Sequence, residues 1–263
     1  IFVNSDNGGD TLYTKGHPGN NYPLRSEKFS YYEGGVRVPA FVYAPGMISA
    51  EKQNTKYHGL MHHVDLIATF YELGGGDTDD LQKDSDSLSQ WSAIMGDTTS
   101  PRSEVILNLP RSRSWKIGES QTSEGAAIRM GNYKMLLNHA YDSWFSPSTG
   151  EDFHSASAMI GMACEYSFYS TGGGSSCVFG NYLFNILEDP TEKNNLWDMS
   201  EYNDIKISMI KRIETIVAEQ TNNYGTLVPE TYEKAKTSTN NDYQKAFAGN
   251  DDYVVPWDCD VIY

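Results

Sequence analysis

Two adjacent side chains that carry oxygen ligands stand near the start of the chain, directly after a short apolar run. Asp6 offers a carboxylate and Asn7 an amide carbonyl, the hard ligands that Ca²⁺ or Mg²⁺ prefers. Neighbouring residues reach one ion only where the backbone turns sharply, and Gly8 and Gly9 permit the φ values of such a turn. In open α/β sheets ligands bind beyond the carboxyl ends of strands. The pattern predicts a divalent-metal site, with an ordinary Asx/Gly turn as the alternative.

A lysine further along the chain is the second candidate. Lys28 lies in a polar segment between Pro23 and the sequence Glu33-Gly34-Gly35. Its ammonium group is a mobile point charge suited to an anionic oxygen. Most lysines are solvated, so the alternative is a surface side chain without a role.

Together these segments resemble the type I sulfatase family, in particular its arylsulfatase B-like (N-acetylgalactosamine-4-sulfatase-like) branch. The similarity is scattered over most of residues 1–220, and several motifs follow the family's order. The motifs are Ser5-Asp6-Asn7-Gly8-Gly9, Tyr22-Pro23-Leu24-Arg25 followed by Lys28, Glu33-Gly34-Gly35-Val36-Arg37-Val38-Pro39, Met61-His62-His63-Val64-Asp65, Ala127-Ile128-Arg129-Met130-Gly131-Asn132-Tyr133-Lys134, and Tyr182-Leu183-Phe184-Asn185-Ile186-Leu187-Glu188-Asp189-Pro190-Thr191-Glu192.

The resemblance implies a role for each candidate. The family's Asp-Asn pair supplies two ligands of a calcium ion, and these positions match Asp6 and Asn7. The family's downstream lysine contacts the substrate sulfate, and it matches Lys28. The family often has glycines before this lysine, whereas this chain has Ser26 and Glu27. A carboxylate at Glu27 would weaken anion binding by Lys28.

The family's nucleophile has no counterpart in this sequence. It is a Cys or Ser in a Cys/Ser-x-Pro-x-Arg motif, oxidised to formylglycine. Asn21-Tyr22-Pro23-Leu24-Arg25 has the proline and arginine spacing, but asparagine cannot become that aldehyde. We therefore expect this chain to be the C-terminal part of a longer sulfatase, inactive alone, whose formylglycine lies upstream.

The implied reaction is a metal-assisted hydrolysis of sulfate esters, of sulfated sugars or aryl sulfates. A divalent ion, with calcium favoured over magnesium, and Lys28 would place positive charge around the sulfuryl oxygens. A phosphoester or phosphonate hydrolase of the same superfamily is one alternative, with Asp65 and His62 or His63 as candidate ligands of a second metal. A non-catalytic sulfoglycan-binding protein is another. The sequence ahead of Ile1 would separate these functions.

The composition is that of an acidic globular protein. The chain has 263 residues, of which 39% are hydrophobic, and a formal net charge of −15. This charge argues against a nucleic-acid partner. It also repels anionic substrates at long range, so binding would depend on local positive groups, namely Lys15, Arg25, Lys28 and Arg37. No apolar stretch approaches the ~20 residues of a membrane helix. The resemblance implies an extracytoplasmic location, whether secreted, lysosomal or periplasmic.

Three cysteines lie in the second half of the chain. Cys164 and Cys177 are 13 positions apart and bracket a Gly/Ser-rich stretch. A disulfide between them would stabilise by roughly 3 kcal/mol, and the family's extracytoplasmic habit favours it over two free thiols. Cys259 remains, either free or paired with a cysteine outside this sequence.

The fold expected is α/β, an alkaline-phosphatase-like sandwich represented by its C-terminal part. Residues 1–100 would belong to the catalytic α/β domain, residues 101–222 would form a small subdomain of antiparallel sheet plus helix, and residues 223–263 would wrap the surface. Residues 143–176 lack periodicity and predict a long loop whose aromatic side chains, Trp144 among them, either pack within it or stack on sugar rings.

Periodicity predicts the elements of each part. In the first part we expect a strand over 36–43, a helix over 62–73 ended by Gly74, and a short helix over 88–95. Spacings of three and four place Val64, Ile67, Phe70 and Tyr71 on one apolar helix face. In the second part Gly131-Asn132 is a hairpin signal. The elements expected there are strands over 104–109, 126–130, 133–137 and 182–186 and a helix over 202–221.

Overall fold

The computed structural model describes residues 1–11, 19–81, 85–110, 125–144 and 178–223. The chain divides into two compact units, Ile1–Ile213 and Glu214–Tyr263. All the contacts discussed below lie within the first unit.

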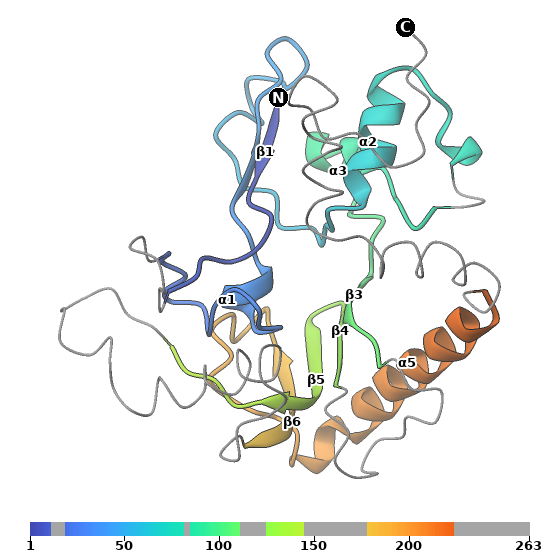
Figure 1. Ribbon diagram of the computed structural model, residues 1–263. Helices are drawn as coiled ribbons and strands as arrows, with labels where there is room; N and C mark the ends of the chain where they lie inside the picture. Colours follow the sequence, from blue (N-terminus) through green and yellow to red (C-terminus); the bar gives the residue numbers. More distant parts are fainter. Residues whose placement is uncertain (12–18, 82–84, 111–124, 145–177, 224–263) are drawn as a thin grey trace, which may run out of the picture. The chain divides into compact units, whose positions relative to one another are not determined.

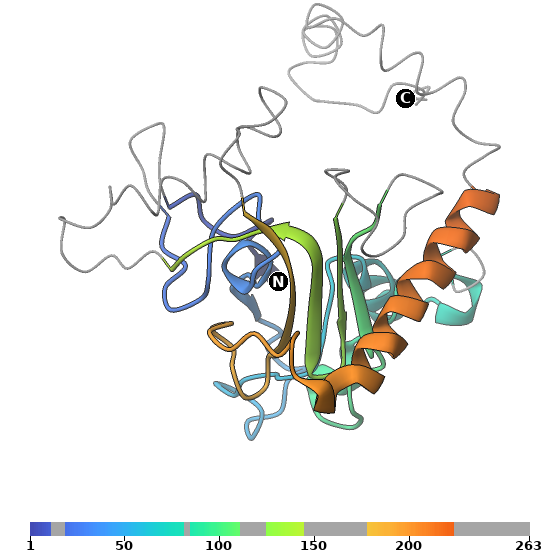
Figure 2. The ribbon, with the colours of Figure 1, turned by 90° about the horizontal axis from the view of Figure 1, so that it is seen from below.

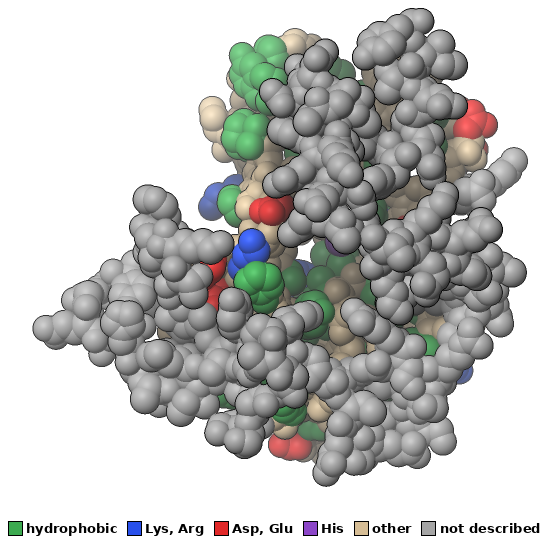
Figure 3. Space-filling view, in the orientation of Figure 1, with side chains coloured by type: hydrophobic (Ala, Val, Ile, Leu, Met, Phe, Trp, Pro, Cys, Tyr) green, Lys and Arg blue, Asp and Glu red, His purple; other side chains and the backbone are tan. Residues whose placement is uncertain are grey.

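A short two-stranded ribbon opens the structure. β1 (Phe2–Asn4) pairs antiparallel with β2 (Ala40–Val42). The expected strand over 36–43 is therefore shorter than predicted, and its first residue belongs instead to the one-turn helix α1 (Glu33–Val36). Phe2 packs edge-on against Phe70, whereas Val3 and Phe41 on the other face are exposed. Figure 3 shows hydrophobic side chains at the surface over this ribbon.

The helix predicted over 62–73 forms as α2 (Asp65–Leu73), and Gly74 follows it as predicted. A single 3-10 turn (Thr78–Asp80) and the short helix α3 (Trp91–Met95) come next. The predicted apolar face of α2 is wrong: Ile67 is 61% and Phe70 51% exposed, while Asp65, Ala68 and Thr69 are buried. Polar contacts to the segment after α2 decide which side of the helix faces inward.

Four antiparallel strands form the second sheet, in the order β3-β4-β5-β6. This confirms the strands predicted beyond residue 100, including the hairpin at Gly131-Asn132. The chain then enters α5, which extends the predicted helix by two residues at its end. The bounds are β3 (Glu104–Asn108), β4 (Ala126–Met130), β5 (Tyr133–Ala140), β6 (Phe179–Asn185), a 3-10 turn (Ser200–Tyr202) and α5 (Asn203–Asn223).

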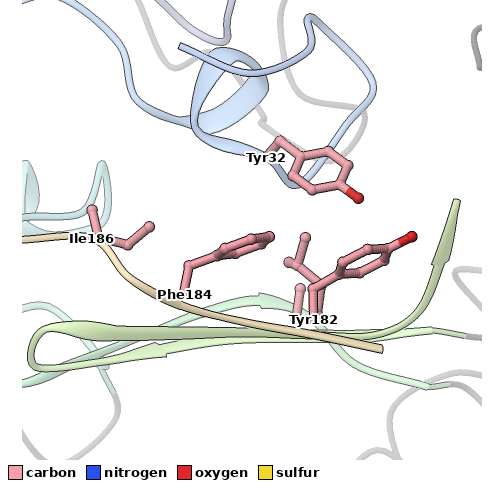
Figure 4. Close-up of a cluster of buried hydrophobic side chains, with 6 residues drawn as sticks. Tyr32, Tyr182, Phe184 and Ile186 are labelled. Carbon is pink, nitrogen blue, oxygen red and sulfur yellow. The ribbon is translucent and has the colours of Figure 1, made fainter. Parts of the chain in front are cut away.

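Both faces of this sheet are buried. Pairing of Ala127 with Leu136, and of Leu136 with Tyr182, aligns these side chains on one face. There Tyr32 covers them, with its ring centroid 5.8 Å from that of Tyr182 and 6.2 Å from that of Phe184 (Figure 4). Residues of the opposite face are buried too, and Figure 2 shows the sheet from below. They are Ile128, Met135, Leu137 and Leu183, and α5 contributes buried Met209 and Ile213.

Several predicted features lie outside the described residues. These are Lys15, most of the loop predicted over 143–176, Cys164 and Cys177, and the tail from residue 224 with Cys259. Trp144 is described, and its indole N–H donates to the Thr191 carbonyl at 2.6 Å, so this side chain packs. Among the described helices none has the length and apolar character needed to cross a membrane.

Candidate active site

The predicted metal ligands follow β1 closely. Asp6 is exposed and Asn7 is partly buried. The Asn7 N–H donates to Asp6 Oδ1 at 2.9 Å, and the Ser5 hydroxyl donates to the Asn7 carbonyl at 2.8 Å. Local turn contacts of the kind expected from the alternative interpretation are therefore present. They leave the Asn7 side chain without a hydrogen bond to any other described residue.

The two glycines after this pair have a role different from the one predicted. Neither Gly8 nor Gly9 takes a left-handed φ. Instead the Gly8 N–H donates to the Gly35 carbonyl at 2.8 Å, and a Cβ on Gly8 would overlap the Gly34 carbonyl oxygen. Glycine is required because two backbones approach closely, and not because the turn needs a positive φ.

The structure brings the Lys28 loop beside these residues. The Lys28 N–H donates to the Gly9 carbonyl at 3.1 Å. Ser26 and Phe29, on either side of Lys28, take left-handed φ values of 67° and 79°. The Lys28 ammonium lies 5.3 Å from the Phe29 ring centroid and has no carboxylate partner within the described residues. Figure 3 shows acidic and basic side chains next to each other in this region, between β1 and α1.

The two residues that depart from the family pattern before Lys28 differ in how well they suit their positions. Ser26 occupies a left-handed position, which costs a serine more than a glycine. Glu27 is buried, and its Oε2 accepts the Thr11 N–H at 2.5 Å and the Thr11 hydroxyl at 2.6 Å. This carboxylate is therefore satisfied inside the protein instead of lying in solvent beside Lys28.

Arg25 does not belong to the positive surface predicted around the site. It is 3% exposed, and its Nε donates to the Asp142 carbonyl at 2.9 Å and its Nη1 to the Glu192 carbonyl at 3.1 Å. The guanidinium carbon lies 4.1 Å from the Tyr32 ring centroid and 4.6 Å from that of Trp144. Arg25 is a buried packing residue that joins this loop to the second sheet.

The donor set fits a divalent cation in part. Asp6 and Asn7 present a carboxylate and an amide oxygen on the same short segment, which suits Ca²⁺. The residues described by the structure hold no group of three or more His, Cys, Asp or Glu side chains that could bind a metal ion. Asp6 and Asn7 would therefore be two members of a larger ligand set.

The side chains considered as ligands of a second metal form other contacts in the structure. Asp65 is fully buried, forms a bidentate pair with Arg102, with Nε–Oδ2 at 2.7 Å, and accepts the His62 N–H at 2.9 Å. These donors hold the pKa of Asp65 below its usual value although burial raises it. The exposed His63 ring instead contacts the Ser5 carbonyl at 3.1 Å through Nε2. Nothing in this geometry favours a second metal at Asp65.

A buried ionic cluster next to the site is absent from the sequence prediction. Lys134, on β5, is fully buried, and its ammonium lies 2.9 Å from Glu33 Oε1 and 2.9 Å from Glu192 Oε1. Burial raises the pKa of Glu33, but the positive charges of Lys134, Arg129 and Arg37 lower it by a larger amount. The pKa therefore lies below its usual value. Burial raises the pKa of Glu192. The sequence feature that could have indicated this cluster is a lysine inside the apolar strand predicted over 133–137.

Comparisons with known proteins agree with the resemblance to sulfatases. Residues 1–76 match the family model described as Sulfatase. The chain is 30% identical to Arylsulfatase J of Mus musculus over 81% of its own length and 34% of that protein. It is 29% identical to N-acetylgalactosamine-6-sulfatase of Mus musculus over 58% of its length and 26% of that protein. The chain thus spans about a third of these relatives or less.

A solved structure shares the fold. Ps i-CgsB, which is also solved in complex with k-i-k-neocarrahexaose, superimposes with a TM-score of 0.50 at 21% identity, over 90% of this chain and 43% of that one. The predicted α/β fold of the alkaline-phosphatase-like type is confirmed. The branch predicted within the family is not resolved by these matches. The family match and the named relatives together support the sulfatase family for this chain.

Proposed function

We propose that the whole protein hydrolyses sulfate esters and that this chain supplies part of its active site. Asp6 and Asn7 would be two ligands of a Ca²⁺ ion, and Lys28 would contact the sulfate. The observation that carries this proposal is the 3.1 Å hydrogen bond from the Lys28 N–H to the Gly9 carbonyl, because it joins the anion-binding loop to the metal-binding segment. The sulfatase match over residues 1–76 includes both segments and supports the same function.

Each group would have a distinct task. A bound Ca²⁺ would supply positive charge to the sulfuryl oxygens and orient the sulfate. Asp6 and Asn7 would hold that charge beyond the end of β1. Lys28 would add a second positive charge, and its attraction for the sulfate strengthens as water is excluded. The nucleophile, a formylglycine by family resemblance, would come from outside these 263 residues.

The substrate class that we propose is a sulfated carbohydrate, with aryl sulfates as simple laboratory substrates. Support comes from a relative whose name is N-acetylgalactosamine-6-sulfatase. The net charge of −15 is consistent with a partner that is bound through local cations instead of a basic surface. By its resemblance to the sulfatase family, the protein would act outside the cytoplasm.

The test compares two variants of the full-length protein with matched controls. Asp6→Ala should abolish hydrolysis of p-nitrophenyl sulfate and weaken Ca²⁺ binding in calorimetry, because the site loses its charged ligand. Lys28→Ala should lower kcat by about 10²-fold or more, as removal of one preorganised charge does, while Ca²⁺ binding remains. The exposed residues Asp97 and Lys56 provide the controls, Asp97→Ala and Lys56→Ala, which should behave like the wild type.

Substrate choice separates the competing functions. Turnover of p-nitrophenyl phosphate with little turnover of the sulfate would indicate a phosphohydrolase. Binding of a sulfated oligosaccharide without turnover would indicate a binding protein. Wild-type activity and Ca²⁺ affinity in Asp6→Ala would contradict the proposed metal site.

A further inference from the structure

The short helix α1 lies against the segment that carries the proposed metal ligands. The Gly8 N–H, one residue after Asn7, donates to the Gly35 carbonyl at 2.8 Å. A Cβ on Gly8 would overlap Gly34 O, so these two backbones are in tight contact. Any displacement of α1 must therefore be transmitted to the residues directly after Asn7.

The same helix also holds the Lys28 loop. The Gly34 N–H donates to the Arg25 carbonyl at 2.7 Å. A Cβ on Gly35 would overlap the carbonyl oxygens of Glu27 and Ser30, which flank Lys28. The two halves of the proposed site thus rest on one turn of helix, at its two glycines.

Glu33 fixes this turn to the second sheet. Its side chain is buried, and its Oε1 lies 2.9 Å from the ammonium of Lys134 on β5. The Glu33 N–H donates to Glu192 Oε2 at 2.6 Å. Lys134 and Glu192 are both fully buried. Figure 1 shows α1 between the β1–β2 ribbon and the strands β5 and β6.

A cluster of this kind favours one geometry strongly. A buried ion pair adds little net stability over apolar residues of the same volume, but losing one partner leaves an uncompensated buried charge. Removing Lys134 would leave the Glu33 and Glu192 carboxylates facing the same space. Among the described residues, the other cations near Glu33 are Arg129 and Arg37, at 3.9 and 3.8 Å from its Oε2. Their longer distances make them poor substitutes for the ammonium.

We propose that Lys134 and Glu33 are positioning residues, which hold α1 and thereby keep the metal-binding segment and the Lys28 loop in register. Lys134 is fully buried against Glu33 and Glu192, so it would act through Glu33 and not by contact with substrate or metal. The role in catalysis rests on the proposed function, whereas the mechanical link between Lys134 and the two segments can be measured without it.

The experiment uses the full-length protein with Lys134→Met, and Lys56→Met as the control for loss of an exposed lysine. Hydrogen-exchange mass spectrometry should show exchange at least about tenfold faster in peptides covering residues 1–10 and 25–37. Peptides covering 126–132 should keep the wild-type rate. The Ca²⁺ concentration for half-maximal binding should rise by about 10- to 100-fold, as for residues that orient metal ligands.

A second variant covers the case in which Lys134→Met does not fold. Glu33→Gln keeps the shape and an acceptor for Lys134 but removes the charge, and it should produce the same local exchange pattern. Unchanged exchange in residues 1–10 and 25–37 in a folded variant would overturn the inference. So would faster exchange spread equally over all peptides of Glu33→Gln. If Asp6→Ala keeps wild-type activity and Ca²⁺ affinity, the proposed metal site fails, but the exchange data still decide the positioning role.

Discussion

At the scale of single residues, buried ionisable groups dominate this structure. His139, on β5, is 7% exposed and lies with its ring centroid 5.3 Å from that of Tyr31 and 5.0 Å from that of Tyr32. Burial, with the nearby charges of Lys134 and Arg25, lowers its pKa from 6.5 to about 3. The folded protein therefore keeps this imidazole neutral at pH values where the unfolded chain binds a proton.

This difference predicts a pH-dependent stability. Because the folded-state pKa is depressed, the stabilisation is present above the unfolded pKa near 6.5 and is lost as the pH falls towards 3. We expect His139 to lower the free energy of unfolding by about 1.4 kcal/mol for each pH unit below 6.5. Urea denaturation at several pH values between 7.5 and 5 measures this slope.

Two variants isolate the contribution of His139. His139→Phe should be less sensitive to pH between 6.5 and 5 by about that slope, since phenylalanine cannot titrate. The exposed His58 provides the control, and His58→Phe should retain the wild-type dependence. Equal slopes in the wild type and His139→Phe would show that His139 protonates without unfolding the protein.

At the scale of elements, the β4–β5 hairpin allows a clean test of backbone conformation. Gly131 has a left-handed φ of 54°, and nothing lies within 4 Å of a Cβ built on it. Gly131→Ala should therefore lower the free energy of unfolding by about 1 kcal/mol from conformation alone. Thermal or urea denaturation measures the change.

Gly74, at the end of α2, is the matched control. It has a right-handed φ of −79°, and a Cβ there would lie 3.4 Å from the Tyr71 carbonyl oxygen, an ordinary contact. Gly74→Ala should leave stability unchanged or raise it by about 0.4–1 kcal/mol. A loss of the same size in both variants would mean that the positive φ of Gly131 is not the cause.

The orientation of α2 is also decided at this scale. Its buried face carries Asp65 and Thr69, and Thr69 Oγ1 accepts the Gln90 N–H at 3.0 Å while donating to the Asp65 carbonyl at 2.6 Å. The Ser87 hydroxyl accepts the Ala68 N–H at 2.8 Å. These polar contacts, together with the Arg102 pair, orient the helix against its apolar periodicity.

At the scale of the whole compact unit, residues 1–213, polar anchors join the first 81 residues to the four-stranded sheet. Arg102, just before β3, pairs with Asp65. Lys134 on β5 pairs with Glu33, and Arg25 bonds the carbonyls of Asp142 and Glu192. Separating the two parts would leave buried charges without partners, which is strongly unfavourable.

We therefore expect the first unit to unfold in one cooperative step. Native-state hydrogen exchange in increasing urea should give the amides of α2 and β5 the same free energy of opening and the same urea dependence. If α2 exchanged through an opening that leaves β5 protected, residues 1–100 and 101–222 would be separate cooperative units. The division near residue 100 remains a prediction, and this measurement tests it.

Much of the architecture follows from the sequence alone. Alternation and turn chemistry are local, so the strands beyond residue 100, the Gly131-Asn132 hairpin and the long helix α5 could be predicted without any tertiary contact. The oxygen donors at Asp6 and Asn7 and the motif order that resembles sulfatases are local features too. Their roles, with that of Lys28, remain proposals.

Only the tertiary structure decided the features that depend on distant partners. Lys134 and Glu33 meet across 101 positions, and Arg25 and Asp142 across 117. Such pairs convert residues that would be solvated charges into buried anchors, and no local pattern contains that information. The same applies to the inward face of α2 and to Gly8, whose small size is required by the Gly34 carbonyl. Periodicity measures apolar character, whereas the buried face is set by whichever long-range contacts satisfy the polar groups.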